Sequence, residues 1–386
     1  MESVFGEVML AWARRAAQHE AGSLLDGHGK AVALVGALLI ALHGSVIGAG
    51  ARPIQAAGEK PAPRVKAVGN RQAREACLQG HKYLQNGTQE SMERAVRYFD
   101  QATKYDPGYA PAYVGLADAY TLLWGFGFVS RGEALPKATE AATKAIALDD
   151  KLAEAHNALA GVKMRDWDWV GAEKEFKRAL ELDPSNVNIR HWYALYLAAM
   201  GRREDAFRES REALRLDPSS LSIQTGAGAI EYFARDYKQM IKQMQSTVAL
   251  GPNFAPGYDW LGMAYVQVGR FEEAIAVYQK AVTLSGGSAE VKAGLGHAYG
   301  VAGQRASARA ILGELNDLAK KKYVPPVQIA FVYLGLGDRA HALDLLEKAY
   351  QERSWELVFI QVEPWVDSLR SDPRFRDIVR RMNFPK

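Results

Sequence analysis

Cysteine is nearly absent from the chain, which has 386 residues and a single cysteine, Cys77. One cysteine excludes an intrachain disulfide and any zinc site built from several thiolates. A strong excess of charge of one sign is also missing, because 48 basic and 44 acidic residues leave a formal net charge of +4. Such a balance produces no strong field for a polyanion, and we expect no nucleic-acid partner.

Catalytic motifs are missing as well. The eight histidines show no HExxH pair or other close metal-ligand spacing, and no serine stands in a GxSxG elbow. We therefore predict that the protein is not an enzyme and needs no cofactor or metal ion. The sequence has two strong features that bear on a binding function, an apolar segment and a long repeat.

Charged residues are absent from residues 31–51, AVALVGALLIALHGSVIGAGA, which are rich in Ala, Val, Leu and Ile. About 20 apolar residues suffice for a helix to span a bilayer, so this segment is predicted to be a transmembrane helix or signal anchor. A second interpretation is a secretory signal cleaved at the small residues Ala49-Gly50-Ala51. Residues 1–30 form a short segment before it, and the proline-containing residues 52–74 are predicted to be an extended linker.

Basic residues flank the apolar segment on both sides, so the positive-inside rule does not orient it. A long C-terminal domain can be translocated largely regardless of its charge. We therefore expect a single-pass membrane protein whose C-terminal domain is extracytoplasmic, which means periplasmic in a bacterium. If the segment is instead a cleaved signal, the protein is secreted or periplasmic.

A period of 34 residues runs through the rest of the chain. Prolines recur at this spacing at Pro184, Pro218 and Pro252. One further step of 34 back from the first proline leads to Asp150, which stands in an equivalent context. The preceding proline, Pro107, lies 43 residues before Asp150, so we predict an insertion of nine residues within 125–133.

Side chains of fixed size recur within each period. Alanines such as Ala172 and Ala179 stand at two positions that allow helices to approach closely, and large rings such as Phe99, Phe176 and Tyr278 stand between them. Glycine recurs where a turn between two helices requires a left-handed backbone. These glycines are Gly201, Gly269, Gly303 and Gly337.

These columns resemble the tetratricopeptide repeat (TPR) family, whose pattern of Trp/Tyr, Leu, Gly/Ala, Tyr, Ala, Phe, Ala and Pro they match over about residues 75–350. The resemblance implies an all-α solenoid, a right-handed superhelix of antiparallel helix pairs, with about seven to eight repeats in residues 75–353. Residues 354–386 are predicted to be a helical cap over the last repeat. Its amphipathic pattern consists of Phe375, Ile378, Val379 and Met382.

The phrases HWYALYLAAMGR and LVFIQVEPWVDSLRSDPRFRD are similar to the C-terminal TPR regions of bacterial membrane-bound regulators. In that group a DNA-binding or kinase domain precedes the membrane segment, and this sequence shows neither. The repeat and the apolar segment together predict a membrane-anchored TPR scaffold or adaptor that binds protein or peptide partners. The alternative is the ligand-sensing component of a split signalling or transcription-regulatory system.

The inner surface of a TPR superhelix is lined by the first helix of each pair. Inward positions that avoid the packing columns are therefore candidates for a partner-binding groove, although each could instead pack between repeats. The candidates are Asn157, His191, Trp192, Tyr232, Asp259, Trp260 and His297. No lysine stands at these inward positions, which argues against a clamp for a C-terminal carboxylate.

One repeat has an acidic and aromatic turn, Asp166-Trp167-Asp168-Trp169, in place of the usual glycine. Its carboxylates could bind a cation. The alternative, which we favour, is that they cap the following helix and that the rings pack against its start.

Overall fold

The computed structural model describes residues 64–84, 89–125 and 128–385. The predictions for residues 1–30 and for the apolar segment 31–51 lie outside the described residues. Within the described ranges, no helix is long and apolar enough to cross a membrane.

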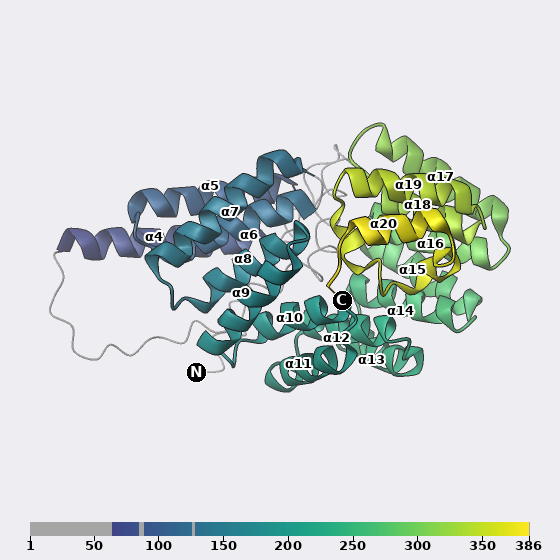
Figure 1. Ribbon diagram of the computed structural model, residues 1–386, viewed down its shortest axis with the longest axis horizontal. Coiled ribbons are helices and arrows are strands. Elements are labelled where there is room, and N and C mark those ends of the chain that lie inside the picture. The colour runs from purple at the N-terminus through teal and green to yellow at the C-terminus, as the bar shows by residue number, and fades with distance from the viewer. Residues whose placement is uncertain (1–63, 85–88, 126–127, 386) are drawn as a thin grey trace, which may run out of the picture.

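The described chain folds into α-helices that pack as eight successive pairs, which confirms the predicted all-α repeat fold. Figure 1 shows the pairs following a curve, with α4–α9 in one arm, α10–α13 at the base and α14–α19 in the other arm. The pairs are α4 (Arg64–Leu84) with α5 (Gln89–Tyr105), α6 (Ala110–Gly125) with α7 (Arg131–Leu148), α8 (Ala153–Arg165) with α9 (Trp169–Leu182), α10 (Val187–Ala199) with α11 (Arg203–Leu216), α12 (Leu221–Phe233) with α13 (Tyr237–Leu250), α14 (Ala255–Gln267) with α15 (Phe271–Leu284), α16 (Ala289–Val301) with α17 (Arg305–Ala319), and α18 (Pro326–Gly335) with α19 (Arg339–Gln351).

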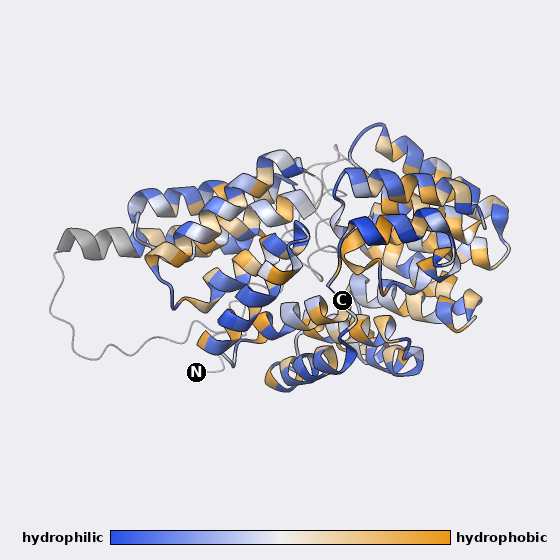
Figure 2. Ribbon diagram, in the orientation of Figure 1, coloured by the Kyte–Doolittle hydropathy of each residue, from blue (hydrophilic) through white to orange (hydrophobic). Residues whose placement is uncertain are grey.

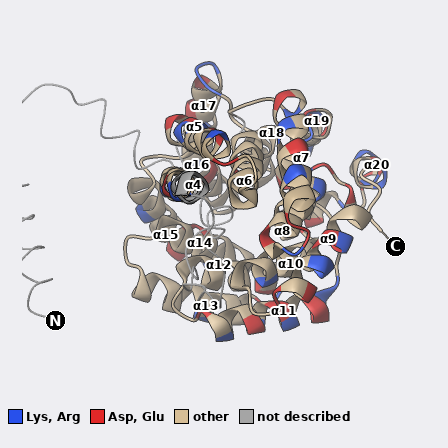
Figure 3. Ribbon diagram, turned by 90° about the vertical axis from the view of Figure 1, so that its left-hand side faces the viewer, with Lys and Arg blue, Asp and Glu red and all other residues tan. Residues whose placement is uncertain are grey.

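The two helices of a pair differ in burial. In α12, the first helix of its pair, every residue from Ile223 to Phe233 is buried, whereas the second helix α13 buries only Met240, Met244 and Thr247. The second helices expose polar faces, and Figure 2 shows α11 and α13 as mainly hydrophilic on the outside of the curve. Figure 3 shows basic and acidic residues interspersed on these outer helices.

Rings fill the space between repeats, as the sequence predicted. The side chains of Phe99 and Tyr278 are fully buried. A Cβ atom added to Gly115 would lie 2.2 Å from the ring of Phe99, and one added to Gly294 would lie 2.4 Å from that of Tyr278. Since no side chain fits in so little space, glycine is required at both contacts.

The turn within a pair has a left-handed residue every 34 residues. The predicted glycines occupy this conformation, with φ of 72° at Gly201 and 79° at Gly337. In two pairs a residue with a side chain adopts it instead, Trp167 with φ 64° and Arg235 with φ 62°. A left-handed backbone costs such a residue roughly 1–2 kcal/mol, so the two side chains are expected to make compensating contacts.

One prediction about a chain segment is corrected, and another is located more exactly. The predicted linker 52–74 is helical from Arg64 onward, because the residues after Pro63 contain no further proline and mostly have good helix propensity. The insertion predicted within 125–133 coincides with longer helices on both sides of the turn. Helices α6 and α7 have 16 and 18 residues, where α8 and α9 have 13 and 14.

After α19 the chain forms two 3₁₀ helices, η2 (Trp355–Phe359) and η3 (Pro364–Leu369), and the helix α20 (Pro373–Arg381). We call residues 354–385 the C-terminal segment. Helix α20 packs on α19, where Arg374 and Arg381 form ion pairs with Asp344 and Glu347. Figure 3 shows α20 beside α19, at the edge of the array.

The C-terminal segment also contacts helices far away in the sequence. The indole Nε1 of Trp169 donates a hydrogen bond to the carbonyl of Met382 at 2.9 Å, and the Trp169 ring stacks on Phe384 at 4.7 Å. The segment therefore does more than cover the last repeat, because it joins the end of the array to the turn between α8 and α9.

The two left-handed side chains hold this part of the chain. The Arg235 guanidinium donates to the carbonyl of Val362 and forms an ion pair with Asp367 at 2.8 Å. The Arg353 guanidinium, in the turn after α19, lies 4.5 Å from the centre of the Trp167 ring. These contacts compensate for the backbone conformation of Trp167 and Arg235.

Candidate binding site on the concave surface

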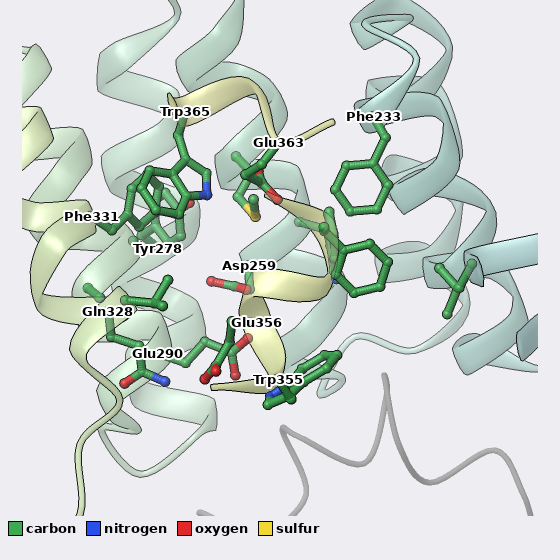
Figure 4. Close-up of a pocket in the computed structure, with 17 residues that line it drawn as sticks. Phe233, Asp259, Tyr278, Glu290, Gln328, Phe331, Trp355, Glu356, Glu363 and Trp365 are labelled. Carbon is green, nitrogen blue, oxygen red and sulfur yellow. The ribbon is translucent and has the colours of Figure 1, made fainter. Parts of the chain in front are cut away.

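A cavity of about 130 Å³ lies between the inner helices α14, α16 and α18 and the C-terminal segment. Figure 4 shows its rings and carboxyl groups turned toward a common centre. Its wall includes seven aromatic side chains, those of Phe233, Trp260, Tyr278, Phe331, Trp355, Phe359 and Trp365. The C-terminal segment supplies three of these rings, so the cavity exists only where that segment is docked.

Four carboxyl groups line the same cavity, those of Asp259, Glu290, Glu356 and Glu363. Asp259 comes from α14 and is only 8% exposed, Glu290 comes from the start of α16, and the other two belong to the C-terminal segment. Figure 4 shows Asp259, Glu290 and Glu356 close together, with Glu363 at the upper edge. Among the described residues that line the cavity there is no Lys, Arg or His. We call this the acidic cavity.

The surroundings of these carboxyl groups favour their protonated form. Burial raises the pKa of Asp259 and that of Glu356 to about 7. Burial and the negative charges of Asp259 and Glu356 raise the pKa of Glu290 well above its usual value. Because an ionised carboxyl needs water or a cation around it, the site holds its negative charge at a free-energy cost.

The pKa of Glu363 is subject to opposing effects. Burial raises its pKa to about 8, the hydroxyl of Tyr232 and the positive charges of Arg235 and Arg370 oppose the increase, and the negative charge of Asp367 adds to it. These arginines are the only cations of the described part of the chain that lower the pKa of any of the four groups.

Three polar atoms at the wall have no hydrogen-bond partner in the described chain. They are the hydroxyl of Tyr278, the Oε1 atom of Gln328 and the Oε1 atom of Glu363. The Tyr278 side chain is fully buried against the cavity. Unsatisfied buried polar atoms are rare in folded proteins, so these atoms are available to a bound group.

A second, smaller cavity of about 30 Å³ lies between α6, α8 and α10. Asp118 and Arg165 both line it, and the buried guanidinium of Arg165 lies 5.4 Å from the centre of the Trp192 ring and 5.7 Å from that of Trp355. Burial raises the pKa of Asp118 to about 7, and the Arg165 charge opposes the increase. We call this the arginine cavity.

The predicted groove residues divide between the two cavities and the core. Asp259 and Trp260 line the acidic cavity, and Asn157 and Trp192 line the arginine cavity. The other three, His191, Tyr232 and His297, line neither cavity and are buried between helices.

The buried histidines of this set have structural contacts. The ring of His297 stacks on Phe331 at 4.0 Å, and its Nδ1 atom hydrogen-bonds the Phe331 carbonyl at 2.9 Å. His191 packs against Gly226, and burial lowers the pKa of both histidines to about 4. Both rings are therefore neutral over the physiological range.

Sequence reasoning missed several residues of the acidic cavity for identifiable reasons. Glu290 lies one helical turn before the inward position Ala293, so extending the inward face by one turn would have found it. The sequence predicts that the Tyr278 ring packs between repeats, and in the structure the ring does so and also lines the cavity. No periodic signal places Glu356, Glu363 or Trp365 in the groove, because they follow the last repeat.

The acidic turn Asp166-Trp167-Asp168-Trp169 behaves as the favoured interpretation predicted. Asp168 caps α9 by accepting a hydrogen bond from the Gly171 N–H at 2.9 Å. Asp166 forms an ion pair with Arg131, and within the described ranges no group of three or more His, Cys, Asp or Glu is placed to hold a metal ion.

Comparison with known families identifies the repeat. Residues 265–324 match the sequence profile described as "Tetratricopeptide repeat". The segment from α15 to α17 therefore resembles tetratricopeptide repeats in sequence, and the other helix pairs share its fold. The TPR match covers α15 and α16 completely, and these helices contribute Tyr278 and Glu290 to the acidic cavity.

Relatives among characterised proteins share part of the TPR array. Superkiller protein 3 of Schizosaccharomyces pombe is 24% identical over 277 residues, which are 70% of this chain and 17% of that protein. Transcriptional regulator HilA of Salmonella typhimurium is 28% identical over 131 residues, which are 34% of this chain and 24% of that protein. The chain thus spans less than a quarter of the length of either relative.

Solved structures share the TPR fold. The human IFIT1 dimer with m7Gppp-AAAA superposes with a TM-score of 0.55 at 17% sequence identity, covering 72% of this chain and 72% of that chain. At this level of identity the likeness concerns the fold alone.

Proposed function

We propose that the protein is a TPR scaffold or adaptor, which captures a protein or peptide partner in its concave groove and catalyses no reaction. The observation that carries this proposal is the acidic cavity, where aromatic rings and unpartnered polar atoms converge at the inside of the array. Aromatic anchors surrounding a few polar groups are typical of recognition sites. TPR arrays offer such sites on their inner surface.

The setting of this module at a membrane rests on the sequence. Residues 31–51 have the length and composition of a membrane anchor. We propose that they tether the TPR domain to the extracytoplasmic, periplasmic side of a bacterial membrane. A cleaved signal in the same place would leave the same domain free in that compartment.

Partner selection tests the binding proposal. A displayed peptide library is selected on the full chain in detergent, and the affinity of the selected peptides is measured for the wild type and two variants. Trp365→Ala removes a partly buried ring of the acidic cavity, and Tyr105→Ala removes an exposed ring on α5. We expect the first variant to bind at least about tenfold more weakly and the second to match the wild type. Equal binding by both variants contradicts the proposal.

A second candidate function is the ligand-sensing component of a split regulatory system. The likeness to HilA, whose name describes a transcriptional regulator, favours it. In that case the ligand is a small molecule, and its binding changes the contacts of a separate regulator. We propose no nucleic-acid partner, because the four carboxyl groups of the acidic cavity repel a phosphodiester chain.

A further inference from the structure

The acidic cavity concentrates negative charge without neutralising it. When ionised, Asp259, Glu290 and Glu356 are close together, and no positive charge of the described chain lowers the pKa of any of them. Taking a carboxylate out of water costs several kcal/mol unless a cation or a hydrogen-bond donor replaces the water. The cavity is therefore stabilised by protons or by a cation from outside.

The wall of the cavity suits an organic cation. A positive group over the face of an aromatic ring, within about 6 Å of its centre, gains electrostatic attraction, and cages of several rings recognise substituted ammonium groups. The rings of Trp260, Trp355 and Trp365 are of the type that gives the strongest attraction, and all three line the cavity. Their apolar faces match the hydrocarbon part of such a ligand.

The neighbouring arginine cavity shows the same chemistry with its cation in place. Arg165 lies 5.4 Å from the centre of the Trp192 ring and 5.7 Å from that of Trp355. The carboxyl group of Asp118 lies in the same cavity. Trp355 lines the acidic cavity, and its ring also contacts the guanidinium of Arg165 from the arginine cavity.

The size of the acidic cavity sets the size of the cation. Its volume of about 130 Å³ is close to that of cavities of about 150 Å³ that admit benzene, a ligand of about six heavy atoms. The side-chain end of lysine or arginine and a small alkylammonium ion are of this size. Among the described residues, no group of three acidic, His or Cys side chains is placed to coordinate a metal ion.

We propose that the acidic cavity binds an organic cation, an alkylammonium or guanidinium group, between its indole rings and the carboxylates of Asp259, Glu290 and Glu356. The cation is carried by a lysine or arginine of a peptide partner or by a free amine. This proposal rests on the proposed binding function and specifies the chemical group that the partner presents. The unpartnered Tyr278 hydroxyl and Gln328 Oε1 accept the N–H groups of the cation.

Calorimetric titration of the full chain in detergent, at about pH 8 where the carboxyl groups are most ionised, tests the proposal. The free probes are tetramethylammonium, n-butylguanidinium and, as an uncharged match for size, tert-butanol. The peptide probes are acetyl-Gly-Lys-Gly-amide and the same peptide with norleucine in place of lysine. Tighter binding of the lysine peptide than of the free cations identifies a peptide source, and the reverse identifies a free amine.

Three variants complete the test. The double variant Asp259→Asn with Glu356→Gln keeps the shape of the cavity and removes two charges, and Glu272→Gln removes an exposed charge from α15. Gln328→Lys keeps every carboxyl group and adds an internal cation. We expect the double variant and Gln328→Lys to bind the cations at least about tenfold more weakly than the wild type, and Glu272→Gln to bind like the wild type.

The proposal is overturned if tert-butanol binds as tightly as tetramethylammonium, if no cationic probe binds the wild type, or if Gln328→Lys, verified as folded by circular dichroism, retains full affinity. These outcomes are independent of the peptide selection. If selected peptides depend on Trp365 while no cation binds, the binding function stands and the cation proposal fails. If cations bind while no peptide is selected, the scaffold proposal fails instead.

Discussion

The arginine cavity and the acidic cavity are built from the same kinds of side chain and differ in charge balance. In the first, Asp118 has a guanidinium opposite it, and the cavity that remains is about 30 Å³. In the second, four carboxyl groups surround about 130 Å³ of open space with no cation in the wall formed by the described residues. The arginine cavity contains an acidic and a basic side chain, whereas the described wall of the acidic cavity contains acidic side chains and no basic one.

This difference shows what distinguishes packing from binding on the concave surface of a repeat array. Indole rings and carboxyl groups occur in both sites, so neither residue type identifies a ligand by itself. A ligand site is indicated where the buried carboxyl groups have no basic side chain beside them. The comparison also separates the two sites experimentally, because removing a cation from the arginine cavity and adding one to the acidic cavity are expected to have opposite effects on stability.

The largest effect on stability is expected from removing the cation of the arginine cavity. Arg165→Met leaves Asp118 buried without its cation and removes the contacts with Trp192 and Trp355. We expect the free energy of unfolding to fall by about 2–4 kcal/mol, measured by urea denaturation at neutral pH. Arg309→Met on the exposed face of α17 is the matched control and should change it by less than about 0.5 kcal/mol. A loss as small as that of the control means that Arg165 contributes little to the stability of the arginine cavity.

A smaller increase in stability is expected from adding a cation to the acidic cavity. Gln328→Lys places an ammonium group beside Glu290, next to which Figure 4 shows the Gln328 side chain. We expect it to stabilise the protein by about 1–2 kcal/mol at about pH 8, as a rise in the thermal midpoint. Gln328→Met, which has a similar size and no charge, should give no such rise. Destabilisation by Lys equal to that by Met contradicts the comparison.

The smallest effect concerns pH and a single carboxyl group of the acidic cavity. Glu363 has a pKa raised from 4.5 to about 8 in the folded protein, so its protonated form stabilises the fold, and that contribution is lost as the pH rises from about 5 to 8. Its environment consists of Tyr232, Arg235, Asp367 and Arg370. Glu363→Gln cannot ionise, so its stability relative to the wild type should increase over this range. Because the Glu363 side chain is partly exposed, screening by solvent reduces the full linkage effect, to about 1 kcal/mol. Thermal midpoints at both pH values measure it, and a constant difference shows that Glu363 does not titrate with folding.

Much of the fold could be predicted from the sequence, because a pattern that recurs in several repeats is recognisable even where one repeat departs from it. The 34-residue spacing and the columns of small and aromatic residues located the helix pairs, and the turn glycines at Gly201 and Gly337 adopt the expected left-handed backbone. The start of the array was misplaced, because the first helix begins before the first recognisable column, at Arg64. A pattern defined by contacts between repeats is weakest where one neighbour is absent.

The candidate site was only partly predictable, for a different reason. Asp259 and Trp260 were found because they stand on the inward face of a repeat helix. Glu356, Glu363 and Trp365 belong to a segment outside the period, whose position depends on long-range contacts with Arg235 and with the turn at Trp169. The periodic pattern reflects packing contacts between adjacent repeats. It therefore gives no information about a segment that contacts several repeats.

The docking of the C-terminal segment changes how the array is expected to unfold. In an open solenoid each repeat contacts only its neighbours, so repeats can be lost one at a time from either end. Here one continuous apolar core extends from Ala160 to Met382, whereas α4–α7 form separate clusters. The hydrogen bond from Trp169 to Met382 connects the start of α9 with the C-terminal segment, so the repeats between them are held at both ends. These repeats should therefore unfold together as one cooperative unit, with fraying confined to the pairs that precede it.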